Sequence, residues 1–174
     1  SRLAVSADVP ALTVLIDAAI AELQRSFLDD SQIASSRAIM GIDRQLIDDG
    51  TYFVIEEDGE LVACGGWSRR DKLYTGSGSG ATDARLLDPR TEAARVRAMF
   101  VRLDRARRGL GTLILEACEA AARREGFRAL ALMATLPGVP LYLAYGFRQL
   151  DEVEVAMPDG VTIACVAMEK PIDD

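Results

Sequence analysis

The chain has 174 residues, 49% of them hydrophobic, with a formal net charge of −7 and a mean hydropathy of +0.10. These values are typical of a globular protein, and we expect residues 1–174 to form a single domain. The negative charge argues against nucleic-acid binding, and no apolar run approaches the ~18 residues that a membrane-spanning helix needs.

The residues available for chemistry are restricted, because the sequence contains no histidine. Any proton transfer must therefore use carboxylates, tyrosine, cysteine, lysine or water. Cys64, Cys118 and Cys165 each lie in an apolar stretch, which indicates buried free thiols in a reducing compartment. We therefore expect a cytoplasmic protein, and without a CxxC pair we expect no metal site.

The first third of the chain reads as a short strand, helices and a hairpin. Residues 2–5 predict a strand, and a helix follows with Leu12, Leu15, Ile16, Ala19, Ile20 and Leu23 at helical spacing, capped by Ser6 or Asp8. Residues 30–49 predict a second helix or a broken pair. Two strands, 51–55 and 61–67, flank an Asp58-Gly59 turn and predict a hairpin.

In residues 69–91 the apolar side chains do not recur with helix or strand spacing, so we expect a flexible loop there. Within it, Gly76 to Ala81 matches the Gly-x-Gly-x-x-Ala dinucleotide fingerprint. No apolar strand precedes this segment and no periodic helix follows it, so a loose Gly/Ser loop is the better interpretation.

The second half predicts strand 94–101, then a long helix whose apolar face comprises Leu110, Leu113, Ile114, Ala117, Cys118 and Ala121 and which Gly126 ends. Strand 127–133, a short helix over 138–145 and strands 147–157 and 161–169 follow. The order indicates an α/β fold with a mixed sheet whose last two strands form a hairpin. The edge strands of that hairpin could pair with those of a second copy of the chain and so form a homodimer.

A concentration of positive charge precedes the long helix. Four arginines fall within seven residues, and Gly109 and Gly111 follow at the helix start; the arginines are Arg102, Arg105, Arg107 and Arg108. Backbone N–H groups at a helix N-terminus carry partial positive charge, and glycines allow a phosphate to approach the main chain. The segment therefore predicts a site for a diphosphate-bearing cofactor, although it fits neither the Walker nor the Rossmann pattern.

Two segments of the second half carry motifs: Ala106-Arg-Arg-Gly-Leu-Gly111 before the long helix, and Leu141-Tyr-Leu-Ala-Tyr-Gly-Phe147 about thirty residues later. Both resemble motifs of the GNAT superfamily of acyl-CoA-dependent N-acyltransferases. The first is similar to the family signature Gln/Arg-x-x-Gly-x-Gly/Ala, with alanine at the first position, and the second resembles the family's Leu-Tyr-x-x-x-Gly-Phe. The resemblance implies a mostly antiparallel central sheet, splayed between its fourth and fifth strands and flanked by about four helices.

The resemblance also implies acetyl-CoA (coenzyme A) as cofactor, with the pantetheine arm in the gap between the splayed strands. Leu132, Met133 and Ala134 would line the far wall of that gap. The residues implied to bind the cofactor are Met99, Phe100, Val101, Arg107, Arg108, Gly109, Leu110, Gly111, Thr112, Thr135 and Tyr142.

The implied reaction is direct attack of an amine on the thioester, which makes the protein an N-acetyltransferase for a primary amine of a small molecule or protein. A main-chain N–H near residues 99–101 would polarise the carbonyl, and Tyr142 would protonate the departing thiolate. Glu92 and Glu152 are candidate bases, with structural charge as the alternative for both. Asp104 is expected on the pyrophosphate side. An acceptor that is already partly neutral would need no base.

Acceptor specificity is expected from the region around Phe27 and from residues 67–91. Trp67 and Tyr74 would form an aromatic wall, and Arg95 or Arg97 would hold an acceptor carboxylate; core packing of Trp67 and solvation of the arginines are equal alternatives. Two other functions stay open. One is a non-catalytic acyl-CoA sensor or regulatory module, and the other is a scaffold without a cofactor.

Overall fold

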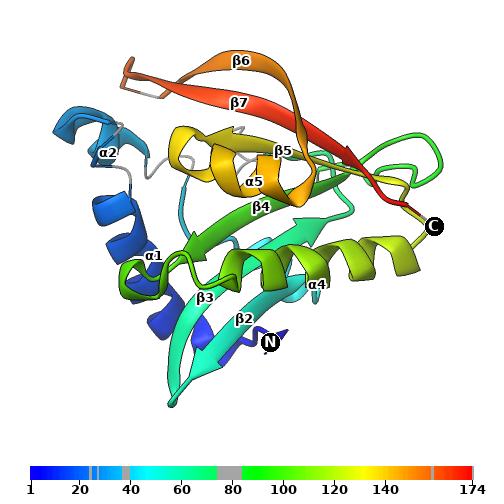
Figure 1. Cartoon of the computed structure of the whole chain (residues 1–174), viewed down its shortest axis with the longest axis horizontal. Helices are drawn as coiled ribbons and strands as arrows, with labels where there is room; N and C mark the ends of the chain where they lie inside the picture. The colour runs from blue at the N-terminus through cyan, green and yellow to red at the C-terminus, as the bar shows by residue number, and fades with distance from the viewer. Residues whose placement is uncertain (24, 27, 37–39, 74–83, 158, 174) are drawn as a thin grey trace.

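The computed structural model describes residues 1–23, 25–26, 28–36, 40–73, 84–157 and 159–173. Its centre is a seven-stranded sheet in the order β1-β2-β3-β4-β5-β7-β6 (Figure 1). Only the β4–β5 pair is parallel, so the predicted mixed α/β fold is confirmed. The strands are β1 (Arg2–Leu3), β2 (Tyr52–Glu57), β3 (Glu60–Ser68), β4 (Ala94–Val101), β5 (Ala129–Thr135), β6 (Arg148–Ala156) and β7 (Thr162–Pro171).

Five α-helices flank the sheet within the described part of the chain, where about four were expected. Residues 30–49 form the broken pair rather than one helix. The helices are α1 (Val9–Leu23), α2 (Asp30–Ser36), α3 (Arg44–Asp48), α4 (Leu110–Arg124) and α5 (Val139–Tyr145). Neither Ser6 nor Asp8 caps α1 as expected: both lie in a short 3-10 turn before it, where Asp8 accepts a hydrogen bond from the Val5 N–H. No helix in the described residues is long and apolar enough to cross a membrane.

The sheet separates two hydrophobic cores, one beneath α4 and the other beneath α1. Alternation along β2 shows the division: Phe53 and Ile55 pack in the α4 core, whereas Tyr52 and Val54 pack in the α1 core. The buried face of α4 is rotated by part of a turn from the predicted one. Leu113 is 49% exposed and Ala117 is only half-buried, whereas Leu115 and Ala122 are fully buried.

A β-bulge interrupts the pairing of β4 with β3. Cys64 pairs with Phe100 and Gly66 with Arg97, so Gly65 faces both Ala98 and Met99. Ala98 adopts a left-handed conformation with φ of 57°. The extra residue reverses the alternation: Val96 belongs to the α4 core, but Ala98 packs against the α1 core.

The pairing of β4 with β5 ends early. Only Ala94 with Leu130 and Arg95 with Ala131 are in register. Beyond them, the strands part, as the resemblance implied, while β5 continues to pair with β7 up to Thr135. Residues 96–101 of β4 therefore have no β5 partner, and this gap positions the candidate site.

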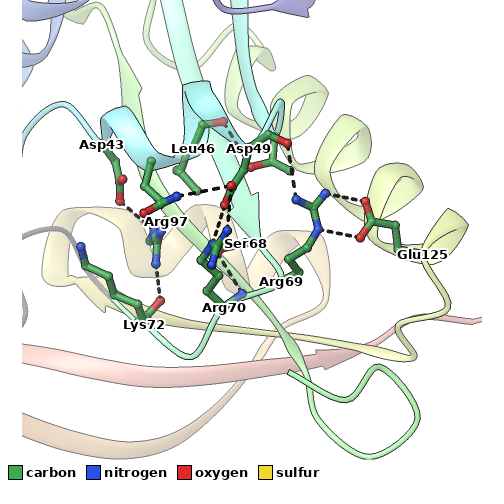
Figure 2. A network of polar contacts seen from close by, with 11 residues as sticks. Asp43, Leu46, Asp49, Ser68, Arg69, Arg70, Lys72, Arg97 and Glu125 are labelled. Carbon is green, nitrogen blue, oxygen red and sulfur yellow. Dashed lines mark hydrogen bonds and ion pairs between the residues drawn. The ribbon is translucent and has the colours of Figure 1, made fainter. Parts of the chain in front are cut away.

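The described residues on either side of positions 74–83, which follow β3, are held to the rest of the fold. Arg70 forms a β-bridge with Leu86, and Leu87 is buried with its N–H bonded to the Arg69 carbonyl. Figure 2 shows that Arg69 also pairs with Glu125 and Arg70 with Asp49, which ties the end of β3 to α3 and to the end of α4. The expected Gly76 to Ala81 loop lies outside the described residues.

We predict that Leu115→Ala lowers the free energy of unfolding by about 2–5 kcal/mol, because it removes a fully buried side chain from the α4 core. Leu113→Ala is the matched control on the exposed side of the same helix and should change it by about 0.5 kcal/mol or less. Urea denaturation measures both. Equal losses in the two variants would contradict this assignment of the α4 face.

Asp49 gives a pH-dependent test of the α3 anchor. Its carboxylate accepts two hydrogen bonds from Arg70, at 2.8 and 3.1 Å, and this contact lowers the pKa of Asp49 below its ordinary 3.8. A pKa lowered by folding adds stability above the unfolded value, and that stability is lost as the pH falls through the folded value. Asp49→Asn should therefore lower the free energy of unfolding by about 1–3 kcal/mol at pH 7, and by less below pH 3.8, where the wild-type carboxylate becomes protonated.

The control for this anchor is Asp48→Asn, because Asp48 is the exposed neighbour in the same helix. Its unfolding free energy should stay within about 0.5 kcal/mol of the wild-type value. A cost of Asp49→Asn that did not vary between pH 7 and pH 3 would show that the ion pair is not its source.

Candidate active site

A cavity of about 850 Å³ opens where β4 and β5 part. Residues 96–101 of β4 form one wall, and Leu132, Met133 and Thr135 of β5 form the opposite wall. The start of α4 and the α5 residues Pro140, Leu141 and Tyr142 also line the cavity. So do residues that the sequence did not indicate as part of the site, among them Ala19, Met40, Gly41 and Cys165.

This cavity passes through the sheet from one hydrophobic core to the other. Met99, Leu132 and Tyr142 belong to the α4 side, whereas Phe100 and Cys165 belong to the α1 side. Burial raises the pKa of the Cys165 thiol to about 11, so this cysteine stays protonated and is a weak nucleophile. The division predicts two ligand sites that meet where the strands part.

The start of α4 has the features of an anion site. Its N-cap is Gly109, which has a left-handed φ of 80° and supplies no side-chain cap, and its first helical hydrogen bond runs from the Leu113 N–H to the Gly109 carbonyl. The N–H groups of residues 110–112 therefore have no partner within the helix. At Gly111 a Cβ atom would lie 2.7 Å from Leu141 Cδ2, so glycine allows α4 to pack closely on α5.

The arginines before α4 do not act as one cluster. Arg102 pairs with Glu60 at 2.7 Å and with Asp104 at 2.6 Å, while Arg105 and Arg108 share Glu57, at 3.2 and 3.6 Å. Of the four, Arg107 alone belongs to the cavity wall. The structure thus places Arg107 and residues 109–112 together in the cavity wall, and it places Arg108 outside that wall.

Tyr142 is buried on α5 and lines the cavity. Its ring meets that of Phe147 edge to face, with centroids 5.7 Å apart, and a Cβ atom at Gly138 would lie 2.9 Å from Tyr142 Cε2. Burial raises the pKa of the phenol well above its ordinary value of 10. The hydroxyl group therefore stays protonated at any ordinary working pH.

Neither candidate base reaches this cavity. Glu92 accepts hydrogen bonds from Arg85 at 2.9 and 2.5 Å and from the Asp88 N–H at 2.8 Å, and these contacts lower its pKa to about 2. Glu152 is exposed on β6, the edge strand of the sheet. The placement favours the structural alternative for both carboxylates.

The described residues predicted to bind the acceptor do not come together in one site. Trp67 is 1% exposed, contacts Phe127 edge to face at 5.8 Å and lies in the α4 core, so it packs in the interior rather than forming an aromatic wall. Arg95 pairs with Asp71 at 3.1 Å and lines a smaller cavity of about 310 Å³ together with Glu92. Phe27 and Tyr74 lie outside the described residues.

Arg97 alone among the described acceptor candidates lines the main cavity. Only 4% exposed, it forms an ion pair with the equally buried Asp43 at 2.8 Å and donates to the Lys72 carbonyl at 2.8 Å (Figure 2). Desolvation lowers the pKa of the guanidinium, yet an arginine keeps its charge in any accessible range. The pair fixes this cation at the edge of the cavity.

Comparisons with known proteins agree with this geometry. A profile of the acetyltransferase (GNAT) family matches residues 16–147, whereas no curated protein sequence matches significantly. A GCN5-related N-acetyltransferase from Rhodopseudomonas palustris superposes with a TM-score of 0.71 at 18% identity, covering 98% of this chain and 96% of that one.

Two further structures carry ligands. The PaiA N-acetyltransferase of Thermoplasma acidophilum, in complex with coenzyme A, has a TM-score of 0.66 at 12% identity and covers 98% of this chain and 96% of its own. A Salmonella typhimurium protein with its cofactor acetyl-CoA has a TM-score of 0.62 at 20% identity, covering 99% and 93%. The fold and the profile match together show that the chain belongs to the GNAT acetyltransferase family.

Proposed function

We propose that this protein transfers an acetyl group from acetyl-CoA to a primary amine of a small molecule or a protein. The observation that carries the proposal is the cavity between β4 and β5, which meets the uncapped start of α4. Its unpaired β4 wall suits an extended chain lying along the strand, and the positively charged start of α4 suits a diphosphate. Similarity to proteins solved with coenzyme A and acetyl-CoA supports the same ligand.

The residues of this chain would hold the cofactor at three places. The N–H groups of residues 110–112 and the Arg107 guanidinium would bind the pyrophosphate. Main-chain groups of Met99, Phe100 and Val101 would pair with the amides of the pantetheine arm, and Thr135 would line the other wall. When bound, acetyl-CoA supplies a thioester whose carbonyl carbon accepts the attacking amine.

We predict that Arg107→Ala weakens coenzyme A binding about three- to tenfold, because it removes one charged contact to phosphate. Alanine retains a Cβ, so the left-handed φ of 63° at this position is strained equally in both proteins. Isothermal calorimetry with coenzyme A and with pantetheine, which lacks the phosphates, provides the measurement. Pantetheine affinity should be unchanged.

Arg124→Ala is the matched control, since it removes the same charge from the exposed far end of α4. It should leave coenzyme A affinity unchanged. Equal weakening by the two substitutions would show that net charge, and not a contact at the start of α4, attracts the ligand.

Tyr142 is the proposed acid. A free thiol has a pKa near 8.5, well below that of this buried phenol, so the phenol would have to be in contact with the sulfur and give up its proton as the C–S bond breaks. The proton that the attacking nitrogen loses would then restore the phenol. A main-chain N–H of residues 99–101 would polarise the thioester carbonyl in the same cavity. Because the phenol stays protonated, ionisation of Tyr142 should not limit the pH range over which the enzyme works.

We predict that Tyr142→Phe lowers kcat by about tenfold or more and leaves coenzyme A affinity nearly unchanged. Release of free thiol from acetyl-CoA measures the rate. Tyr145→Phe is the control, because it removes a hydroxyl from the same short helix and Tyr145 does not line the cavity. Undiminished kcat in Tyr142→Phe would remove the acid role.

The base and the acceptor follow from the cavity wall. Of the described residues in that wall, none is Asp or Glu, and the charged ones are Arg97 and Arg107. We therefore propose an acceptor amine that arrives partly deprotonated, with Arg97 facing its carboxylate or carbonyl group. A thiol-release assay over a panel of amines identifies the acceptor, and binding without thiol release for any amine would favour the sensor function.

A further inference from the structure

Tyr52 connects two strands that are not neighbours. It lies on β2, is fully buried, and donates a hydrogen bond from its hydroxyl to the main-chain carbonyl of Ala98, at 2.9 Å. Ala98 belongs to β4, and the whole of β3 lies between β2 and β4. The side chain therefore crosses one strand to reach the backbone of the next.

Gly66 makes this crossing possible. In the sheet register, Tyr52 is opposite Gly66, and Gly66 is opposite Arg97, the residue before Ala98. A Cβ atom at position 66 would lie 2.7 Å from Tyr52 Cδ2. The ring thus occupies the space above the glycine, and any side chain there would displace it.

The bond ends on the most strained residue of β4. Ala98 has a φ of 57°. Glycine adopts such values readily, whereas residues with a Cβ, apart from asparagine and aspartate, rarely do. Alanine does not favour this conformation by itself, so the surrounding structure must hold it. The hydrogen bond from the Tyr52 hydroxyl fixes the direction of the Ala98 carbonyl and so helps to hold this conformation.

The residues after the bulge are those that face the gap. Met99, Phe100 and Val101 have no β5 partner, and all three line the cavity. Their direction depends on the turn at Ala98, because the extra residue reverses which side of the strand faces each core.

We propose that Tyr52 is a positioning residue: its bond to Ala98 holds the bulge that aims the main chain of residues 99–101 into the cofactor cavity. The consequence for cofactor binding rests on the proposed function, whereas the effect on the strand does not. Burial raises the pKa of Tyr52 well above 10, so the donor is present at all working pH values.

The first measurement uses the ligand-free protein. Hydrogen exchange of peptides covering residues 96–101 should be faster in Tyr52→Phe than in wild type, because the carbonyl of Ala98 loses its partner and the segment opens more often. Exchange in α4 should be unchanged. Unchanged exchange in residues 96–101 would overturn the proposal without any reference to function.

The second measurement is coenzyme A affinity by calorimetry. Tyr52→Phe should raise Kd about five- to tenfold, the scale set by loss of one hydrogen bond. The double variant Y52F/A98G should recover at least half of that loss on a logarithmic scale, because glycine adopts the left-handed conformation without help. A purely structural tyrosine would lower thermal stability but would not give this rescue.

Tyr145→Phe supplies the control, because it removes a hydroxyl from a tyrosine that does not line the cavity. It leaves the Tyr52–Ala98 bond in place and should leave the Kd for coenzyme A unchanged. A Kd that rises equally in Tyr145→Phe, or stays at the wild-type value in Tyr52→Phe, would overturn the positioning role. Absence of coenzyme A binding to the wild-type protein would instead refute the proposed function, and the exchange result alone would then decide whether Tyr52 holds the bulge.

Discussion

The early end of pairing between β4 and β5 is the constraint on which the rest of the site depends. A strand in the middle of a sheet normally satisfies its N–H and C=O groups on both sides. Here only the first residues of β4 do so, and the remainder faces a gap. A ligand with amide groups along an extended chain fits such an edge, as an added strand does. The bulge at Ala98, the start of α4 and the α5 wall all lie around this one gap.

Positive charge at the proposed phosphate site comes mainly from the backbone. Most of the arginines before α4 are neutralised by carboxylates of the β2–β3 hairpin or of their own turn, as with Glu57 and Asp104. What is left facing the cavity is Arg107 and the free N–H groups at the helix start. In the function proposed above, such a site would recognise the geometry of a phosphate more than its charge, which suits a chain whose net charge is −7.

The sequence was most informative where local chemistry determines structure. The Asp58-Gly59 turn, the α4 start at Gly109 and its end near Gly126 were all predictable, because positive φ favours these residues. The GNAT resemblance rested on such segments, and the family match confirms it. The splay followed from that resemblance rather than from any periodicity.

Features that depend on distant partners were not predictable. Nothing in the residues around Ala98 indicates a left-handed alanine, because its partner Tyr52 is 46 positions away. For Glu92 the sequence left a base and a structural charge open, because no periodic pattern in residues 85–92 indicates the turn that brings Arg85 and the Asp88 N–H to its carboxylate. Trp67 could not be assigned to core or cavity from its own strand, because Phe127 covers it from elsewhere in the fold.

The passage of the cavity through the sheet has a consequence for how such proteins diversify. Its wall at the start of α4 belongs to one hydrophobic core, and its wall at Met40 and Cys165 belongs to the other. Replacements on α1 or around Met40 can reshape the second wall without altering the packing beneath α4. If the protein works as proposed, one scaffold can thus retain a constant donor while its recipient changes, since the two requirements fall on separate sets of buried side chains.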